Sequence, residues 1–289
     1  MSNVSIGVLS LYEVFAYYFV YAFLGWIAEV CFHAIKYGNF ANRGFLNGPM
    51  CPIYGYGVTF ILLILGKWVE KPWAVLLVGI ALPTLLELVG GWTMEKLFHH
   101  KWWDYSNRKL NFKGYICLEF SILWGLAAVC VICVLHPAIK WLINLIPEPY
   151  ATIAISILLA VYVADNIVTF LQLGKFNKKL KELDTATKVM RIGSDAIGKK
   201  IADVSIVVGE KAGAAKEKIN QTYEKAVDTI VAKMPQRILN AFPTLQSRKN
   251  PDAVPIARES VKRIKRHKKK KPETEVVNEI ATDNSDNSN

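Results

Sequence analysis

The hydrophobic pattern of this chain consists of long apolar stretches separated by short polar segments. A helix needs about 20 apolar residues to cross a bilayer core of roughly 30 Å, and four of the five stretches reach that length. Tryptophan and tyrosine gather at their ends, as in interfacial belts. The pattern therefore predicts an all-α, polytopic membrane helix bundle with five spans, at residues 12–35, 53–69, 72–91, 115–139 and 150–173.

The second stretch is the shortest, with 17 residues, and it begins beside Pro49 and Pro52. A partly extended segment can enter a membrane only where protein buries its backbone polar groups. We therefore expect this stretch to enter the bundle either as a short helix or as a partly extended loop.

A short pattern of residues occurs twice, 66 positions apart, with the Asn-Arg pair offset by 65. Each copy begins at the end of one apolar stretch and stops where the next begins. The first copy comprises Gly25, Trp26, Glu29, Phe32, His33, Asn42, Arg43 and Cys51, and the second Gly91, Trp92, Glu95, Phe98, His99, Asn107, Arg108 and Cys117. Such a repeat predicts two pseudosymmetric membrane hairpins with a site where they meet.

Basic residues predict the orientation of the spans. The first eleven residues contain no Lys or Arg, the loops after the first, second, third and fourth stretches carry two, two, five and one, and the region after residue 174 is rich in lysine. Basic loops face the cytoplasm, so we expect a multi-pass cell-membrane protein with its N-terminus outside and its tail cytoplasmic. The start of the chain has no basic segment and no small-residue cleavage site, so a cleaved signal peptide is not expected.

The net charge of +11 is concentrated in the tail, because residues 1–173 contain 10 basic and 9 acidic side chains. From Met190 to Met234, apolar residues recur in steps of 3, 4 and 4, an 11-residue period that predicts an amphipathic helix. We expect a transmembrane domain at 1–173, a helical cytoplasmic region at 174–249, and a basic, then polar, disordered tail at 250–289.

A polybasic run spans residues 262–271, where eight of ten residues are Lys or Arg. Near a membrane, each such charge attracts anionic lipid by about 1 kcal/mol. No aromatic residue interleaves the run, so specific nucleic-acid binding is not expected. The predicted anionic-lipid contacts are Lys262, Arg263, Lys265, Arg266, Lys268, Lys269, Lys270 and Lys271.

The candidate site consists of polar residues at the cytoplasmic ends of the repeated hairpins. Glu29 and His33, four residues apart, share a helix face, as do Glu95 and His99. A carboxylate within a membrane is energetically costly and is by default a functional candidate. The predicted site residues are Glu29, His33, Asn42, Arg43, Glu87, Glu95, His99, Asp104, Asn107, Arg108 and Glu119.

Three interpretations of these polar residues remain open. They can form ion pairs that hold the bundle together, with Arg43 and Arg108 near Glu29 and Glu95, or they can line a solute or proton site. Two Glu and two His could also bind a metal, but such a site requires a convergence that spacing does not establish. We therefore predict no metal and no cofactor.

The chain resembles a known family in several segments. Residues 42–55 read Asn-Arg-Gly-Phe-Leu-Asn-Gly-Pro-Met-Cys-Pro-Ile-Tyr-Gly and follow Gly25, Trp26 and Glu29, while residues 102–106 read Trp-Trp-Asp-Tyr-Ser. These segments, and Ala-Phe-Pro at 241–243, resemble the CmpB-type family of ABC-transporter type IV membrane proteins. The resemblance is strongest over residues 12–135. It implies a transport-associated membrane protein and specifies neither substrate nor catalytic residues.

An ABC transporter also needs a nucleotide-binding domain. Residues 193–200 imitate a phosphate-binding loop, but Lys200 stands where Ser or Thr is required, and the preceding residues predict a polar helix rather than a buried strand. Any ATP hydrolysis is therefore expected from a separate ATPase chain.

The sequence thus favours a permease-like or transport-associated component, with the bilayer and a separate ATPase or other membrane subunit as partners. The alternative is a non-transporting membrane scaffold or assembly factor that acts through its basic amphipathic tail. A membrane enzyme acting on lipid headgroups is a third class, but no serine-nucleophile motif or complete metal motif supports it. The sequence names no substrate, energy source or oligomeric state.

Overall fold

The structure is a computed structural model that describes residues 5–203 and 209–266. Within these residues, five helices are long and apolar enough to cross a membrane, which confirms the prediction of a five-span helical membrane protein. They are Leu11–Tyr37, Pro52–Glu70, Pro72–Phe98, Leu118–Asn144 and Glu148–Gly193. The chain divides into a membrane unit, residues 1–173 and 240–246, and a tail unit, residues 174–239 and 247–289.

The first span, α1 (Leu11–Tyr37), follows a small hairpin of β1 (Ser5–Ile6) and β2 (Leu9–Ser10). Its N-terminus carries a capping box: the Ser10 hydroxyl accepts from the Glu13 N–H at 3.2 Å, and the Glu13 carboxylate accepts from the Ser10 N–H at 2.8 Å. These bonds pair backbone N–H groups that the first helical turn leaves free. The helix ends at Gly38, whose φ of 69° favours glycine.

The second span is helical from its first residue. It consists of α2 (Pro52–Leu65) and the 3₁₀ turn η1 (Gly66–Glu70), so the expected alternative of a partly extended entry is not observed. The third span, α3 (Pro72–Phe98), also begins with a proline. Proline suits these positions because its missing N–H would be unpaired there in any residue.

The fourth span is one continuous helix with an irregular centre. It comprises α4 (Leu118–Cys130), the π-helical turn η2 (Val131–Leu135) and α5 (His136–Asn144). Pro137, which cannot donate a backbone hydrogen bond, lies just after the π turn. At the same place, the Nδ1 atom of buried His136 shares a hydrogen bond with the Tyr21 hydroxyl at 2.9 Å.

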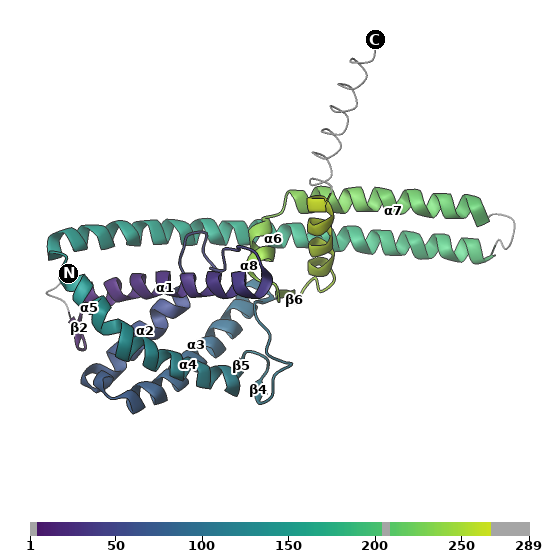
Figure 1. The fold of residues 1–289 in the computed structure, drawn as a ribbon. Helices are drawn as coiled ribbons and strands as arrows, with labels where there is room; N and C mark the ends of the chain where they lie inside the picture. Colours follow the sequence, from purple (N-terminus) through teal and green to yellow (C-terminus); the bar gives the residue numbers. More distant parts are fainter. Residues whose placement is uncertain (1–4, 204–208, 267–289) are drawn as a thin grey trace, which may run out of the picture. The chain divides into compact units, whose positions relative to one another are not determined.

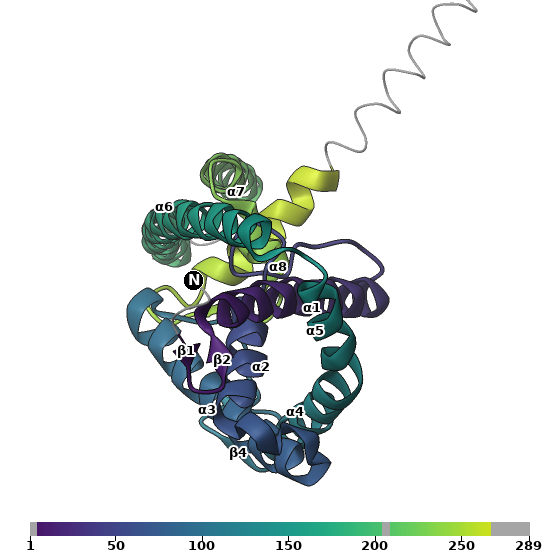
Figure 2. The same ribbon diagram turned by 90° about the vertical axis from the view of Figure 1, so that its left-hand side faces the viewer.

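Glycines allow the membrane helices to approach closely. A Cβ atom at Gly79 of α3 would lie 2.6 Å from the Cβ of Ala128 in α4, and one at Gly55 of α2 would lie 2.6 Å from the Tyr18 carbonyl oxygen of α1. Small residues at such crossings are typical of membrane helix pairs. Figure 2 views the membrane unit from the end where β1 and β2 lie.

Two long loops connect consecutive spans. Residues 38–51, the first loop, join α1 to α2, and residues 99–117, the second loop, join α3 to α4. The second loop contains β3 (His100–Lys101) and an antiparallel pair of β4 (Asn111–Phe112) and β5 (Ile116–Cys117). The two loops contact each other, since the rings of Phe45 and Trp102 lie 5.4 Å apart between centroids.

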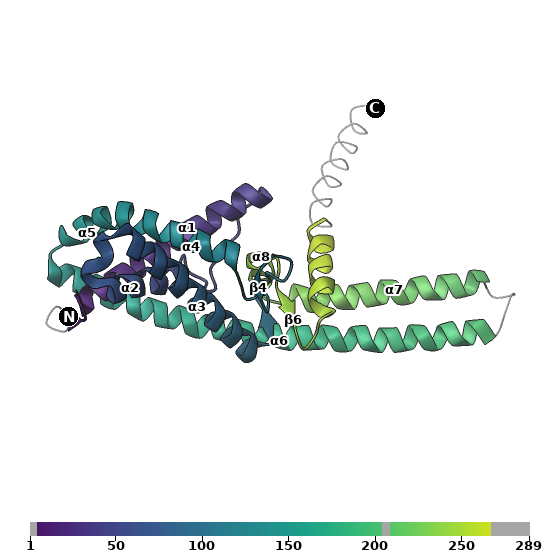
Figure 3. The same ribbon diagram turned by 90° about the horizontal axis from the view of Figure 1, so that it is seen from below.

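The fifth span belongs to α6 (Glu148–Asp203), whose residues up to 173 lie in the membrane unit. The tail unit contains the rest of α6, then α7 (Gly209–Ala232), α8 (Gln236–Ala241, as far as residue 239), β6 (Gln246–Ser247, from residue 247) and a helix over residues 253–266. Within this unit, α7 lies beside the second part of α6 (Figures 1 and 3). The buried apolar residues of the tail unit include Phe176, Leu180, Leu183, Val227, Val231, Val254 and Val261.

Two sequence predictions fall in the tail unit. The apolar stripe from Met190 to Met234 was predicted as one helix. Its members up to Ile201 lie in α6 and those from Ala212 to Ile230 in α7, whereas Val204 and Val208 lie outside the described residues and Met234 follows the end of α7. The side chains of residues 194–216 also lie outside the described ones. Residues 193–200 lie inside α6, so the imitation of a phosphate-binding loop has neither the strand nor the loop that such a motif requires.

Candidate functional site

Asp165, an acidic residue of the fifth span, holds the first long loop by hydrogen bonds. Its Oδ1 atom accepts from the Asn47 backbone N–H at 3.1 Å and from the Asn47 side chain at 3.0 Å, and its Oδ2 atom accepts from the Gly48 N–H at 2.8 Å. Hydrogen bonds that converge on one carboxylate fix the position of the groups that donate them. Asp165 thus fixes the loop that carries Arg43.

Glu29 of α1 is paired from two directions. Arg43 of the first loop donates to its Oε2 atom at 3.3 Å, and the Tyr54 hydroxyl of α2 donates to its Oε1 atom at 2.7 Å. One turn earlier in α1, a Cβ atom at Gly25 would lie 2.4 Å from the ring Cγ of Tyr54. Glycine therefore makes room for the tyrosine that binds the glutamate.

Glu95 of α3 has a similar arrangement. The Tyr115 hydroxyl donates to its Oε2 atom at 2.9 Å, and a Cβ atom at Gly91 would lie 3.1 Å from the Tyr115 ring and 3.0 Å from that of Trp103. The Trp103 indole N–H donates to the Tyr115 carbonyl at 2.9 Å. In both hairpins, a glycine and a glutamate four residues apart thus present one helix face to a tyrosine.

Glu87 is the most buried of these carboxyl groups, with 6% of the residue exposed. Its Oε1 atom accepts from the Tyr105 hydroxyl at 3.3 Å, and its Oε2 atom is buried without a hydrogen-bond partner among the described residues. The indole N–H of Trp124 in α4 faces the same carboxyl group but is outside hydrogen-bond geometry. Burial, followed by the nearby charge of Glu87 and then Glu29, raises the pKa of Tyr105.

Asp104 anchors the turn of the second loop. Lys101 forms an ion pair with its Oδ1 atom at 2.7 Å, and the Ser106 hydroxyl donates to the same atom at 2.5 Å. Burial alone would raise the pKa of Asp104, but the hydrogen bonds from Lys101 and Ser106 outweigh it and lower the pKa to about 2. The loop is therefore held by a charged pair in a half-buried position.

Residues 240–246, the docked segment, lie against both loops. Arg43 donates to the Ala241 carbonyl oxygen, and its guanidinium lies 6.0 Å from the centroid of the Phe242 ring. The Phe242 ring meets the Trp102 ring edge to face at 4.6 Å, and the Thr244 hydroxyl donates to the Trp102 carbonyl at 3.2 Å. Arg43 thus links Glu29 of the bundle to the docked segment.

The remaining predicted site residues have separate partners. His33 Nε2 shares a hydrogen bond with the Asn39 side chain at 3.1 Å, and the Asn42 side-chain Oδ1 atom accepts from the Trp26 indole N–H at 2.8 Å. The other four are His99, which caps α3 with a φ of 60°, Arg108 and Glu119, which form an exposed ion pair at 3.4 Å, and exposed Asn107. In the described part of the chain, no three His, Cys, Asp or Glu side chains converge as metal ligands would.

The predicted lipid contacts are only partly described. Lys262, Lys265 and Arg266 are exposed in the helix of residues 253–266, whereas Arg263 binds Asp228 through two nitrogens, at 2.7 and 3.1 Å, and Glu224 at 3.1 Å. The other four, Lys268, Lys269, Lys270 and Lys271, lie outside the described residues.

The family model named CmpB, described as Putative ABC-transporter type IV, matches residues 16–170, more than half of the chain. The chain belongs to this family. The part that matches the CmpB family contains all the intramembrane carboxylates discussed above, while the docked segment lies beyond it. No curated protein and no solved structure matches the chain.

Several residues of this CmpB-family site were not predicted as site residues. Tyr54, Tyr105 and Tyr115 donate to the three glutamates, and Asp165 holds the first loop. The tyrosines stand at different places relative to the repeat, so the repeat itself gave no sign of them. Asp165 was visible as an intramembrane acidic residue, but nothing in the sequence paired it with Asn47.

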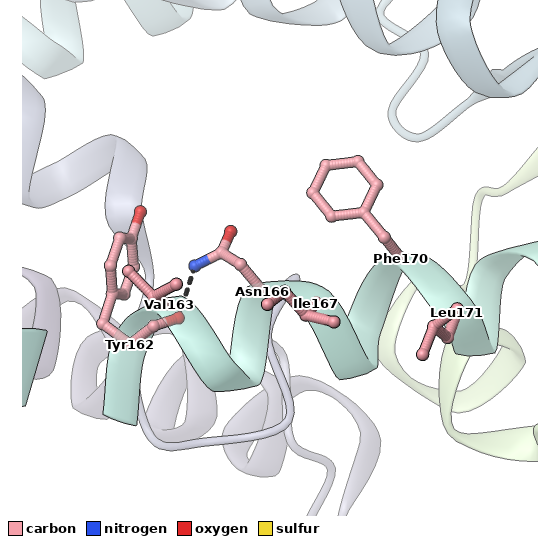
Figure 4. A pocket seen from close by; sticks show the side chains of 6 residues that line it. All are labelled: Tyr162, Val163, Asn166, Ile167, Phe170 and Leu171. Carbon is pink, nitrogen blue, oxygen red and sulfur yellow. Dashed lines mark hydrogen bonds between the residues drawn. The ribbon is translucent and has the colours of Figure 1, made fainter. Parts of the chain in front are cut away.

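A groove of about 480 Å³ also runs along α6 (Figure 4). Asn166 lies at the centre of the groove. The side-chain amide of Asn166 donates to the Tyr162 backbone carbonyl at 2.7 Å. None of the glutamates described above lines it. The lining residues are Tyr162, Val163, Asn166, Ile167, Phe170 and Leu171.

Proposed function

We propose that the chain is a permease-like, transport-associated membrane component whose ATP hydrolysis, if its transport requires any, is supplied by a separate chain. The family description and the five apolar spans support this assignment. The observation that carries it is the buried carboxyl group of Glu87, which lies between α3, the second loop and α4 with one oxygen unpaired. An ionisable group in such a place is by default a solute or proton site.

In this proposal, the two hairpins α1–α2 and α3–α4 are pseudosymmetric halves. The recurrence of a glycine, a glutamate and a tyrosine donor in each half supports the relation. Because α1 and α3 would then run in the same direction, the axis relating the halves lies along the membrane normal. The polar cluster would lie where the halves meet.

The proposal also includes an orientation. The long loops and the tail are cytoplasmic and the N-terminus is outside, as the distribution of Lys and Arg favours. The exposed basic residues of the tail then bind anionic lipid, with Lys262, Lys265 and Arg266 as the described candidates.

The test is purification of the full-length chain from its native membrane in mild detergent, followed by identification of co-eluting proteins. The proposal predicts an ATPase or another membrane subunit at a fixed ratio that withstands repeated chromatography. Two results together would contradict the proposal. The chain would elute without a partner, and the Glu87→Gln variant would retain the full function of the wild type in cells.

A second candidate is a non-transporting membrane scaffold or assembly factor. The docked segment favours it, because this segment connects two parts of the tail unit and is held by Arg43 and Trp102 of the membrane unit. The loops would then serve to bind the docked segment rather than to pass a solute.

The two candidates differ in their response to Phe242→Ala. A scaffold predicts that this change releases the docked segment, seen as faster amide hydrogen exchange in residues 240–246, and abolishes function together with partner binding. Phe112→Ala, which truncates an exposed ring of the second loop, is the matched control. Function retained with a released segment would argue against the scaffold.

A further inference from the structure

Glu29 and Glu87 are two neighbouring carboxyl groups with different surroundings. Glu29 has the Arg43 guanidinium at 3.3 Å and the Tyr54 hydroxyl at 2.7 Å, so its negative charge is balanced and hydrogen-bonded. Among the described residues, Glu87 makes no ion pair and accepts one long hydrogen bond, from Tyr105 at 3.3 Å. The two carboxyl groups therefore differ in the partners that surround them.

The unpaired oxygen of Glu87 makes the charged form costly. A buried carboxylate oxygen without a donor loses its hydration and receives nothing in exchange. Three groups face Glu87: the Tyr105 hydroxyl and the Trp124 indole favour its charged form, while Glu29 opposes it with a like charge. Of the two donors, only Tyr105 is within hydrogen-bond geometry, at 3.3 Å, so the Oε2 atom stays without a donor among the described residues. Neutralising the carboxyl group removes this penalty.

We propose that Glu87 is a proton-binding site of the membrane unit, whose carboxyl group holds a proton at neutral pH. The Tyr105 hydroxyl connects the proton-binding group to the second loop. The proton thus has a defined position, on the Glu87 carboxyl group between α3, the second loop and α4.

The inference deepens the proposed function by naming the bound ion, since it rests on the same polar cluster. Its test reads the proton directly and needs no transport assay. The failure of the proposed function can therefore be distinguished from the failure of this inference. A protonated Glu87 in a protein that transports nothing would contradict the first and leave the second standing.

The first experiment is labelling of the full-length protein in detergent with dicyclohexylcarbodiimide, an apolar reagent that reacts with protonated carboxyl groups. At about pH 7, above the ordinary glutamate pKa of about 4.3, peptide mass mapping should find the adduct on Glu87 and not on Glu29. The Glu87→Gln variant should lose this adduct, and Glu119→Gln, at an exposed carboxyl group, should keep it. An adduct on Glu29 instead of Glu87 would overturn the proposal.

A second measurement covers the case in which the reagent cannot reach the site. The infrared spectrum at about pH 7 should contain a protonated-carboxyl C=O band that Glu87→Gln removes. Glutamine resembles a protonated glutamate in shape and charge, so Glu87→Gln should also leave the unfolding midpoint unchanged, whereas Glu29→Gln lowers it. If Glu87→Gln removes no such band, Glu87 is ionised and the proposal is wrong.

Discussion

A glycine followed four residues later by a glutamate has a simple physical role in this protein. At Gly25 and Gly91, the missing side chain leaves space for an aromatic ring, and Glu29 and Glu95 accept the hydroxyl hydrogen of that ring. The spacing of four places both residues on one helix face. This role is one of packing and hydrogen bonding, and it requires no solute.

Removal of the tyrosine hydroxyl should therefore reduce stability. Tyr54→Phe deletes one of the two donors to Glu29, and a hydrogen bond to a charged group contributes about 1.5–3 kcal/mol. We expect a loss of that size in the free energy of unfolding in detergent. Tyr150→Phe, at a ring that is 70% exposed, is the control and should change nothing measurable. Equal effects of both variants would contradict this reading.

Asp104 should make stability depend on pH in acid. Its pKa of about 2 in the folded protein lies below the ordinary value of about 3.9. The carboxylate therefore stabilises the fold fully above about pH 4, and this contribution is lost as the pH falls through about 2. The difference in unfolding midpoint between wild type and Asp104→Asn should shrink over that range. Ser106→Ala, which retains the carboxylate, should show a smaller change, and a constant difference at all pH values would refute the assignment.

At this scale, the sequence identified the glutamates but not their donors. The ion pair of Glu29 with Arg43 could be anticipated, because the loop after α1 has to fold back over the end of that helix. Arg108, by contrast, forms an ion pair with Glu119, and the Tyr115 hydroxyl donates to Glu95. Loop conformation decides these pairings, and residue spacing does not encode it.

Helix positions were largely predictable, because the bilayer imposes one length and one polarity on every span. Helix ends were less so. The third apolar stretch ends at residue 91, and the helix was expected to continue far enough for Glu95 and His99 to share one face. It continues through Glu95 and Lys96 but ends at Phe98, and His99 caps it with a φ of 60°. Backbone hydrogen bonding favours continuing a helix after its apolar surface has ended. Hydropathy therefore marks the apolar part of a span rather than the whole helix.

The crossing of α3 and α4 gives a prediction at the scale of elements. Gly79→Ala would place a Cβ atom 2.6 Å from the Cβ of Ala128, so the two helices must separate. Overpacking of this kind destabilises by about 1–3 kcal/mol. Gly90→Ala in the same helix meets no atom within 4 Å and should be neutral or stabilising, because alanine favours a helix by roughly 0.5–1 kcal/mol over glycine. Unfolding in detergent measures both, and similar values for the two variants would contradict the packing argument.

At the scale of the whole molecule, charge predicts the orientation in the membrane. A cysteine at position 250, in a background without the five native cysteines, should react with a membrane-impermeant thiol reagent only from the cytoplasmic side. A cysteine in place of Asn144, at the end of α5, should react only from outside. Labelling of position 250 from outside would refute the five-span orientation.

The docked segment was not predictable as part of the membrane unit. Sequence placed residues 174–249 in one cytoplasmic region, because hydropathy and charge change only once, near residue 174. Residues 240–246 nevertheless cluster with the membrane unit through Arg43, Trp102 and Asp104. A few aromatic and hydrogen-bond contacts determine this, and such contacts leave no periodic trace in a sequence.

The docked segment is also comparable to a ligand that is covalently joined to its receptor. It is joined at residue 239 to the same chain, which leads back to the membrane unit through residues 174–239, so its local concentration at the loops is set by that connection and not by the bulk concentration. Contacts as few as those of Phe242 and Thr244 can then keep it bound. A free peptide of the same sequence would have to match that local concentration to compete, whereas a cut in the chain before residue 240 would remove the covalent connection and weaken its hold without altering any contact.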